Sequence, residues 1–463
     1  MAERERADIA VIGAGPSGMA AAMRVAKAGV SVVLLDEFPE AGGAVWRGLA
    51  NASGERKQRL TRDYSAGFEM LERFSGKALE HKRGAKVWEV SRDRVISYSQ
   101  GEVAKQLTAR RIILATGALE RPMPFPGWTI PGVLTAGAAQ IMLKTSGLVP
   151  AGPVVMAGSG PLLYLVAKQL LEAGHPPEAI IDTTPRKNRH RALRHLPMRA
   201  SAWASIAKGL SWQRKLRRSG VDIHRDASKL KAHGEAEVEK IRFQSRGQSF
   251  DLPCTTLLIH TGVVPNVQLS RAIGVAHVWD DAGLAWRPRT DDMGRTDVDG
   301  ILVAGDGAGI AGAGAAVHSG RLAALAALED LADADDAEVA RETTARQKQR
   351  ALRPFLDRLF TPHPDFLRPE DDTIVCRCEG VTAGQIRQLV AQGCHDPNAV
   401  KSLGRAGMGP CQGRYCGLTV AQLVAEVRGT LPAEAGYFRL RSPVKPVTLA
   451  ELAGLGEPED GND

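Results

Sequence analysis

A glycine-rich turn between an apolar strand and an apolar helix constrains this chain more than any other feature. The run DIAVI leads into the turn GAGPSG, and a helical stretch, MAAAMRVAKAG, then leads to a second strand, VSVVLLD, which ends at Asp36. This order is typical of a βαβ unit that binds a dinucleotide. Gly13 permits the tight turn, Gly15 lets the backbone approach a pyrophosphate, and Gly18 allows close packing of helix on strand.

The same pattern returns later in the chain. Residues 153–181 again read as strand, glycine turn, helix and strand, although Leu163 stands where the third glycine would be. A strand ending in Thr-Gly follows each unit, at 111–117 and at 256–262. The repeat predicts an α/β fold with two Rossmann-like dinucleotide-binding domains, the second inserted in the first. The first domain is expected to resume near residue 290 and to close with a helix at 315–330.

Three further segments favour FAD at the first site. Asp36 is placed to accept hydrogen bonds from a ribose, with Glu37 as the neighbouring alternative, and a glycine pair ending at Gly43 follows. The segment GILVAGDG places Asp306 after a buried strand, where a carboxylate can accept hydrogen bonds from the sugar-alcohol hydroxyls of FAD. The predicted cofactor-binding positions are Gly13, Gly15, Pro16, Ser17, Gly18, Asp36, Glu37, Gly43, Arg47, Val87, Thr116, Gly117, Gly305 and Asp306.

The second glycine motif allows two interpretations. Asp182 ends its second strand, and the cations Arg186, Lys187 and Arg189 could bind the 2′-phosphate of NADPH. The alternative, which Leu163 favours, is a degenerate nucleotide domain kept as a scaffold or docking surface, because the third glycine is needed for the usual geometry. No C-x-x-C pair lies near either domain, which disfavours a thiol–disulfide reductase.

Five of the six cysteines are gathered near the C-terminus, which indicates metal or redox chemistry. Cys376, Cys378, Cys411 and Cys416 supply the four thiolates that a [2Fe-2S] cluster requires. Zinc is the rival ligand, but C-x-C is less usual than C-x2-C in structural zinc sites. Cys394 is then a bystander, and the isolated Cys254 is expected to be buried and inert.

These features divide the chain into segments. The expected order is an FAD-binding domain in two parts (1–117 and 290–330), an inserted second nucleotide domain (118–289), a helix and linker (331–373), a [2Fe-2S] ferredoxin-like domain (374–430) and a C-terminal tail (431–463).

Charge and hydropathy narrow the setting in which the chain works. The net charge of +8 over 463 residues is a mild excess without a nucleic-acid reader motif, so no nucleic-acid partner is expected. No run approaches the roughly 20 apolar residues that span a bilayer, and no secretory signal is visible. We therefore expect a cytoplasmic protein, with membrane association only through a complex. The basic stretch 186–218, with Trp203 and Trp212, is either a solvated surface or part of a protein interface.

Taken together, the motifs resemble those of one family: the FAD-binding alpha subunits of bacterial opine oxidases and hydrogen cyanide synthase, with related heteromeric proline and hydroxyproline dehydrogenases. The resemblance covers nearly the whole chain. It depends on VIGAGPSG, LLDEFPEAGGAVWR, ILATGALERPMPFPGW, PGVLTAGAAQ, AGSGPLLYLVAKQLL, HTGVVPN, VAGDGAGIAG and CRCEGVT…GMGPCQGRYC. The last segment is similar to bacterioferritin-associated ferredoxin, although its second cysteine pair is C-x4-C where the small ferredoxin has C-x2-C.

The resemblance implies an oxidoreductase that acts on CH–NH or CH–NH2 donors as one subunit of a multi-subunit dehydrogenase. Substrate oxidation would occur in a flavoprotein beta subunit of the glycine/sarcosine-oxidase type, and this chain would relay electrons. A small gamma subunit with a further [2Fe-2S] cluster sometimes joins. Some relatives carry FMN between alpha and beta subunits, and some hold ATP in place of FAD.

Two alternative functions stay open at this point. The chain could be a stand-alone NAD(P)H-dependent flavin reductase, or a redox-silent nucleotide-binding scaffold. No catalytic acid or base is predicted, because no constellation of side chains outlines a substrate pocket. His318 is either near the flavin or a helix-surface histidine, and the second is the commoner case.

Overall fold

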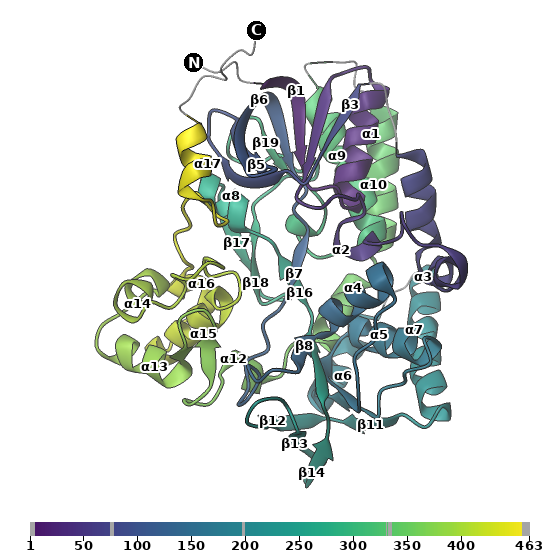
Figure 1. Ribbon diagram of the computed structural model, residues 1–463, viewed down its shortest axis with the longest axis vertical. Coiled ribbons are helices and arrows are strands. Elements are labelled where there is room, and N and C mark those ends of the chain that lie inside the picture. Colours follow the sequence, from purple (N-terminus) through teal and green to yellow (C-terminus); the bar gives the residue numbers. More distant parts are fainter. Residues whose placement is uncertain (1–4, 75–77, 197–199, 330, 332–335, 456–463) are drawn as a thin grey trace.

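The computed structural model describes residues 5–74, 78–196, 200–329, 331 and 336–455. Two α/β domains lie one above the other, and a small helical module packs beside the lower one (Figure 1). In the described residues, no helix is both long and apolar enough to cross a membrane.

The first domain is built on one large sheet. Its strand order is β3-β2-β1-β6-β5-β4, and β19 lies beside β6. The strands are β1 (Glu5–Ile12), β2 (Val32–Asp36), β3 (Leu79–Arg83), β4 (Lys86–Val90), β5 (Val95–Gln100), β6 (Val103–Leu114) and β19 (Ile301–Val303). β1, β2, β3, β6 and β19 run parallel, so their carboxyl ends share one edge. Ligands of open α/β sheets bind at that edge.

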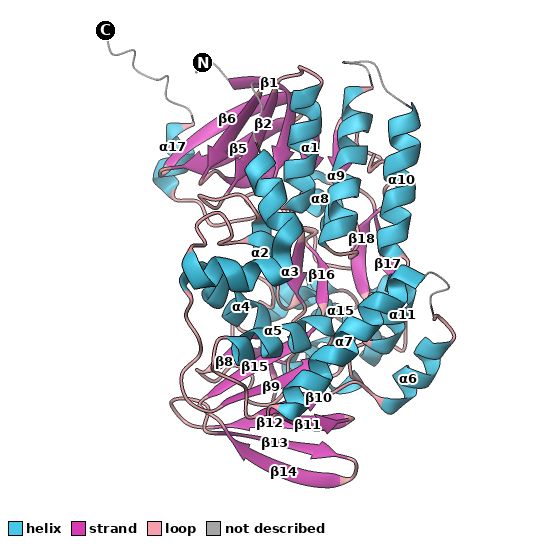
Figure 2. Cartoon of the chain, turned by 90° about the vertical axis from the view of Figure 1, so that its right-hand side faces the viewer, coloured by secondary structure: helices cyan, strands magenta, loops and turns pink. Residues whose placement is uncertain are grey.

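Three parallel-running helices cover one face of this sheet (Figure 2). They are α1 (Pro16–Lys27), α9 (Ala313–Leu328) and α10 (Asp336–Arg350). The first two approach so closely that a Cβ atom on Gly320 would lie 2.0 Å from the carbonyl oxygen of Ser17. Because only glycine permits this approach, Gly320 helps to fix the position of α9, which follows the predicted Gly-Asp segment.

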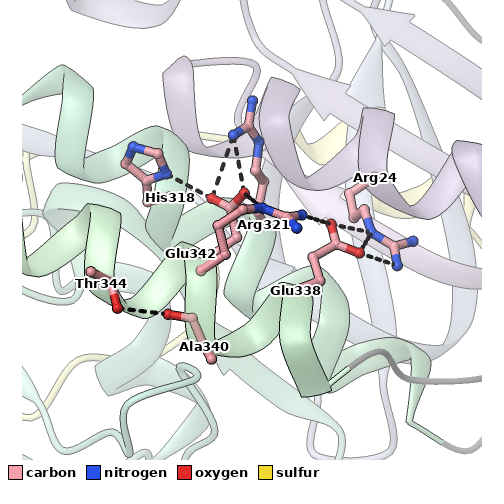
Figure 3. Close-up of polar contacts among 8 residues, drawn as sticks. Arg24, His318, Arg321, Glu338, Ala340, Glu342 and Thr344 are labelled. Atoms are coloured by element: carbon pink, nitrogen blue, oxygen red, sulfur yellow. Dashed lines mark hydrogen bonds and ion pairs between the residues drawn. The ribbon is translucent and has the colours of Figure 1, made fainter.

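Ion pairs fasten α10 onto its two neighbours (Figure 3). Glu338 accepts two hydrogen bonds from Arg24 of α1, and buried Glu342 lies 2.6 Å from Nδ1 of His318 and 3.3 Å from Arg321, both on α9. The pairing with Glu342 gives His318 a structural role in helix packing.

The second domain has its own parallel sheet, in the order β11-β10-β9-β15-β8. The strands are β8 (Val133–Thr135), β9 (Val154–Ser159), β10 (Ala179–Asp182), β11 (Asp222–Arg225) and β15 (Thr256–Thr261), and an antiparallel sheet is added by β12 (Ala227–His233), β13 (Lys240–Ser245) and β14 (Gln248–Pro253). Its helices are α4 (Ala136–Ser146), α5 (Pro161–Glu172), α6 (Arg186–Leu193) and α7 (Ala200–Arg218).

Two short antiparallel strands, β7 (Ala118–Glu120) and β16 (Val263–Pro265), lead into and out of the second domain and lie between the two lobes (Figure 1). The chain then forms α8 (Gln268–Ile273) and the hairpin β17 (His277–Asp280) and β18 (Ala285–Pro288), and returns to the first sheet through β19. This connectivity confirms the predicted two-domain fold with the second domain inserted in the first. The residue at which each domain begins stays a prediction.

The remaining chain wraps around both domains. Helix α11 (Arg353–Leu359) packs against α6, and α12 (Pro364–Leu367) buries Phe366 in the core of the second domain. The helical module follows, with β20 (Ile374–Cys376), β21 (Val381–Thr382), α13 (Ala383–Ala391), α14 (Pro397–Gly404), α15 (Gly417–Arg428) and α16 (Pro432–Ala435). The tail then returns to the first sheet, where Val444 donates a hydrogen bond to Trp88, and ends with α17 (Leu449–Gly454).

Candidate functional site

The first glycine turn has the close contacts that its motif requires. Gly13 has a φ of +105°, and a Cβ atom there would lie 2.5 Å from the carbonyl oxygen of Ala115 on the neighbouring strand connection. A Cβ atom on Gly18 would lie 1.8 Å from the carbonyl oxygen of Gly13. Both positions therefore depend on glycine for the fold of the turn itself.

Gly15 differs, because space is left above it. The nearest atom to a Cβ built on Gly15 is the Cα of Gly43, 3.8 Å away. Gly43 belongs to the short helix α2 (Gly43–Trp46), and a hydrogen bond from Gly42 to the carbonyl of Ala14 holds that segment over the turn. The Oγ atom of Ser17 is buried here and finds no hydrogen-bond partner in the described residues. A glycine-lined space with a free buried hydroxyl at a helix N-terminus fits a pyrophosphate.

Asp36 lies at the carboxyl end of β2, but its carboxylate is partly engaged. One oxygen accepts a hydrogen bond from the Ala14 amide, and the other accepts one of 2.8 Å from the Phe38 amide. Burial raises the pKa of Asp36, and these two hydrogen bonds oppose that rise. Asp36 thus orders the glycine turn and can still accept a ribose hydroxyl through its remaining lone pairs. The exposed Glu37 forms an ion pair with Lys445 of the tail.

Arg47 ends the loop that begins at Gly42. Its guanidinium stacks over the ring of Phe38, with Cζ 3.5 Å from the ring centroid. Burial lowers the pKa of Arg47, and Asp36 and Glu37 oppose the change by favouring the charged form. A stacked cation beside the two predicted ribose acceptors balances their charge at this edge.

The predicted segments from β6 and β19 meet on the other side of the turn. A Cβ atom on Gly305 would lie 2.7 Å from the Cβ of Ser17, and one on Gly307 would lie 3.5 Å from the backbone of Gly117. Asp306 accepts hydrogen bonds from the amides of the residues before α9, at 2.8 and 2.9 Å. The structure thus brings the glycine turn, the Thr-Gly segment and the Gly-Asp segment together. Val87 is buried in the antiparallel strand β4, at the far end of the sheet order.

Two residues of this region carried no signal in the sequence. Asn266, just after β16, donates its amide to the carbonyl of Gly117 and accepts a hydrogen bond from Thr116 on its own carbonyl. Lys144, on α4 of the second domain, is fully buried and donates to the carbonyls of Ala44 and Val45, both at 2.9 Å.

Lys144 is a buried cation at the carboxyl end of α2. Burial, helped by the charge of Arg47, lowers the pKa of Lys144 to about 7. A cation in this position stabilises the last carbonyls of a helix. Lys144 therefore fastens the cofactor loop of the first domain to a helix of the second.

The second glycine motif is occupied by side chains of the chain itself. The hydroxyl of Tyr164, on α5, donates a 2.6 Å hydrogen bond to Asp182, the acid that would bind a ribose. The ring of His260 lies 3.4 Å from a Cβ built on Gly160, and its Nδ1 is 2.7 Å from Glu120. Leu163 is completely buried in the core beneath α5. Both the ribose acid and the glycine surface therefore already have protein partners.

The four predicted cluster ligands come together in the C-terminal module. Their thiols form two close pairs, Cys376 with Cys416 and Cys378 with Cys411, and all four are near enough to influence one another electrostatically. The thiol of Cys416 and the amides of Gly407, Glu379 and Cys378 lower the pKa of Cys376 to about 6, against the effect of burial. Cys376 and Cys416 are buried, whereas Cys378 is exposed.

This arrangement fits a two-iron cluster. Over the residues that the structure describes, no three metal-binding side chains surround one point, as a single zinc ion would need. In a [2Fe-2S] cluster each iron is held by two of the four thiolates. The amide of Gly407 points at the sulfur of Cys376, at 3.5 Å, and Gly409 leaves room for the side chain of Cys378. Cys394 is buried in the module's core and Cys254 in that of the second domain.

Comparison with known proteins agrees with both parts of this site. Residues 7–320 match the pyridine nucleotide-disulphide oxidoreductase family, and residues 374–426 match the BFD-like [2Fe-2S] binding domain. A solved structure, L-proline dehydrogenase from P. horikoshii, shares the fold with a TM-score of 0.71 and 21% identity, over 98% of this chain and 81% of that one.

Two curated relatives match along almost their whole length. The first of the opine oxidase subunits of Agrobacterium tumefaciens, which carries the letter A, is 44% identical over 97% of this chain and 92% of that protein. The HcnB protein of the hydrogen cyanide synthase of Pseudomonas aeruginosa is 32% identical over 96% of this chain and 98% of that protein. The resemblance drawn from the motifs is thereby confirmed: the chain is an oxidoreductase subunit that belongs to the family of HcnB and these opine oxidase proteins, with a two-dinucleotide-binding flavoprotein fold and a C-terminal [2Fe-2S]-binding domain.

Proposed function

We propose that this chain is the electron-transferring alpha subunit of a heteromeric amine or amino-acid dehydrogenase of the opine, proline, hydroxyproline or glycine type. The observation that carries the proposal is the direct packing of the cysteine module on the strands that leave the nucleotide site. Leu418, two residues after Cys416, packs with Val264 of β16, and Val264 pairs with Leu119 of β7, two residues after Gly117. One continuous packed seam thus joins the two predicted redox sites.

FAD is the nucleotide that we propose for the first site, with ATP as the alternative that some relatives suggest. FAD, when bound, accepts electrons in pairs and passes them on one at a time, as a one-electron cluster requires. The chain's own residues bind and orient it: the Gly15–Gly43 space takes the pyrophosphate, Asp36 or Glu37 takes the ribose, and Asp306 takes the sugar-alcohol chain. Lys144 holds the loop that covers this site.

The catalytic step belongs, in this proposal, to a partner. We propose a flavoprotein beta subunit of the glycine/sarcosine-oxidase type, FMN between the two proteins, and a further member in the form of a small gamma subunit with its own [2Fe-2S] cluster. The names of the relatives, each one of the subunits of an oxidase or synthase, support an assembly of several chains. We place the complex in the cytoplasm.

Helix α7 offers a surface for part of that contact. It exposes Trp203 and Leu210, about half of each side chain, beside the basic residues of 214–218. Tryptophan and arginine are enriched where protein partners bind. We therefore place part of the beta-subunit contact on α7.

The lone chain is expected to lack dehydrogenase activity and to gain it only with its partner. The test is to purify it alone and with the products of neighbouring genes, then to assay opines, proline, hydroxyproline, sarcosine and glycine with a dye acceptor. Turnover only in the complex supports the proposal. Robust turnover by the chain alone would place the substrate site within it and overturn the division of labour.

NAD(P)H is expected to reduce the flavin slowly or not at all. Tyr164 holds Asp182, His260 covers Gly160, and Leu163 replaces the third glycine, so a second dinucleotide would have to displace buried partners. Stopped-flow mixing with NADPH tests this, with dithionite as the control that shows the flavin to be reducible. Flavin bleaching by NADPH at many turnovers per second would favour a stand-alone reductase instead.

A further inference from the structure

The guanidinium of Arg271 is held between two aromatic rings where the cysteine module meets the nucleotide domains. Arg271 lies on α8, with its Cζ 4.8 Å from the ring of Trp286 and 4.6 Å from the ring of Tyr437. Its Nε and Nη2 atoms are buried and have no hydrogen-bond partner among the described residues. Stacking of this kind stabilises the cation and orients it, but leaves its charge uncompensated.

Tyr437 connects this cation to the cluster site. Its hydroxyl is 3.5 Å from the carbonyl oxygen of Gly413, and a Cβ atom on Gly417 would lie 2.4 Å from that hydroxyl. Gly413 and Gly417 flank the ligand Cys416. Burial raises the pKa of Tyr437, Arg271 opposes this, and the thiols of Cys416 and Cys411 add to it. One tyrosine ring therefore separates Arg271 from the cluster ligands.

The charge of Arg271 persists and is not neutralised nearby. Burial lowers the pKa of Arg271 to about 10, which still leaves the side chain charged at neutral pH. In the part of the chain that the structure describes, no carboxylate lies within ion-pair distance of it. The adjoining cavity, lined by Gln268, Trp286 and Tyr437, has a volume of about 10 Å³ and holds at most one water molecule. The surroundings thus have a low dielectric and screen the charge poorly.

We propose that Arg271 is a positioning and potential-setting residue for the cluster: its buried, uncompensated charge stabilises the reduced cluster and raises the reduction potential. This rests on the proposed function, in which the module holds a [2Fe-2S] cluster. On reduction the cluster takes one electron from the reduced flavin, one ferric ion becomes ferrous, and no bond forms or breaks. The site gains one negative charge, and net charge and hydrogen bonding around a cluster set its potential. Electron flow from flavin to cluster is favoured accordingly.

The test is a redox titration of the full chain, purified anaerobically, with dithionite and mediators and with the cluster followed by EPR. Arg271→Met keeps the stem of the side chain and removes the charge. We expect about a tenfold lower ratio of reduced to oxidised cluster at a fixed poise, which is a shift of about 59 mV to lower potential for one electron. Arg271→Lys keeps the charge and should retain most of the wild-type potential.

Arg405→Met is the matched control. Arg405 is exposed, lies in the same module, and pairs with Glu379 at 2.8 Å, so solvent and its partner already screen it. Its removal should shift the potential much less than that of Arg271. An intact cluster with an unchanged potential in Arg271→Met, or equal shifts in Arg271→Met and Arg405→Met, overturns the inference. Wild-type protein without a [2Fe-2S] signal would instead overturn the proposed function.

The lysine variant decides the case in which Arg271→Met loses its cluster. A potential close to that of the wild type in Arg271→Lys supports a role for the charge. A reduced-to-oxidised ratio in Arg271→Lys that falls by the full factor of about ten contradicts it, because the charge is still present there.

Discussion

Gly15→Val is expected to yield a folded protein that no longer holds its nucleotide. A Cβ atom on Gly15 has no neighbour nearer than 3.8 Å, so the branched side chain fits the fold itself, but it fills the space between Gly15 and Gly43. A pyrophosphate that must pass there meets a clash of about 1–3 kcal/mol or more, which weakens binding on the order of 100-fold. The measurement is nucleotide released from purified protein, per chain, with the melting temperature as the fold readout.

Two other glycines serve as controls for this experiment. Gly18→Val places its side chain against the carbonyl of Gly13, where a Cβ atom would already lie 1.8 Å away, and should destabilise the whole domain. Gly209→Val, on α7, has no neighbouring atom within 4 Å of its Cβ and should change nucleotide content little. Full nucleotide occupancy in Gly15→Val would mean that the nucleotide does not lie over this turn.

Cys416→Ala is expected to remove the iron from the C-terminal module. Cys416 is buried, lies at the start of α15 and is paired with Cys376, so its loss leaves an iron without one of its two thiolates. Wild-type protein purified anaerobically should contain about two irons per chain and no stoichiometric zinc, and the variant close to none. Metal analysis and the visible absorption of the cluster are the measurements.

Cys394→Ala is the control within the same module. Cys394 is equally buried in the module's core but belongs to neither thiol pair, so this variant should keep its iron. Loss of iron in both variants would point to a general unfolding of the module. Zinc without iron in the wild type would contradict the assignment of a [2Fe-2S] cluster.

The fold and the two sites could be predicted where a local pattern has one physical solution. Gly13 and Gly18 sit where any side chain collides with backbone, so the motif constrains the turn wherever the rest of the chain lies. The repeat of strand, turn and helix predicted the insertion, which β19 confirms by pairing with β6. The four cysteines were predicted from thiolate chemistry and spacing, and the structure brings them together.

The remaining features depend on contacts between segments that are distant in the sequence. Lys144 looks like an ordinary helix lysine, and only the docking of α4 on α2 shows that it binds the cofactor loop. Arg271 becomes notable only when Trp286 and Tyr437, from two other segments, enclose it. Likewise the sequence predicted a degenerate second site from Leu163 alone, whereas the bond from Tyr164 to Asp182 gives it a further cause.

Asp36 shows a subtler difference between pattern and structure. Its place at the end of β2 predicts a ribose acceptor, yet its two oxygens also hold the amides of Ala14 and Phe38. One carboxylate thus orders the glycine turn and faces the ribose position, and a change to alanine would disturb both at once. Gly15→Val is the cleaner test of nucleotide binding for this reason.

The central claim, that this chain relays electrons from a partner's substrate to its own cluster, has one direct test. The complex with its beta subunit is mixed anaerobically with the amine or amino acid that it oxidises, frozen, and examined by EPR. The account predicts a reduced [2Fe-2S] signal that appears with substrate, and no such signal when the lone chain receives the same substrate. Substrate oxidation in the complex while the cluster stays oxidised would contradict it.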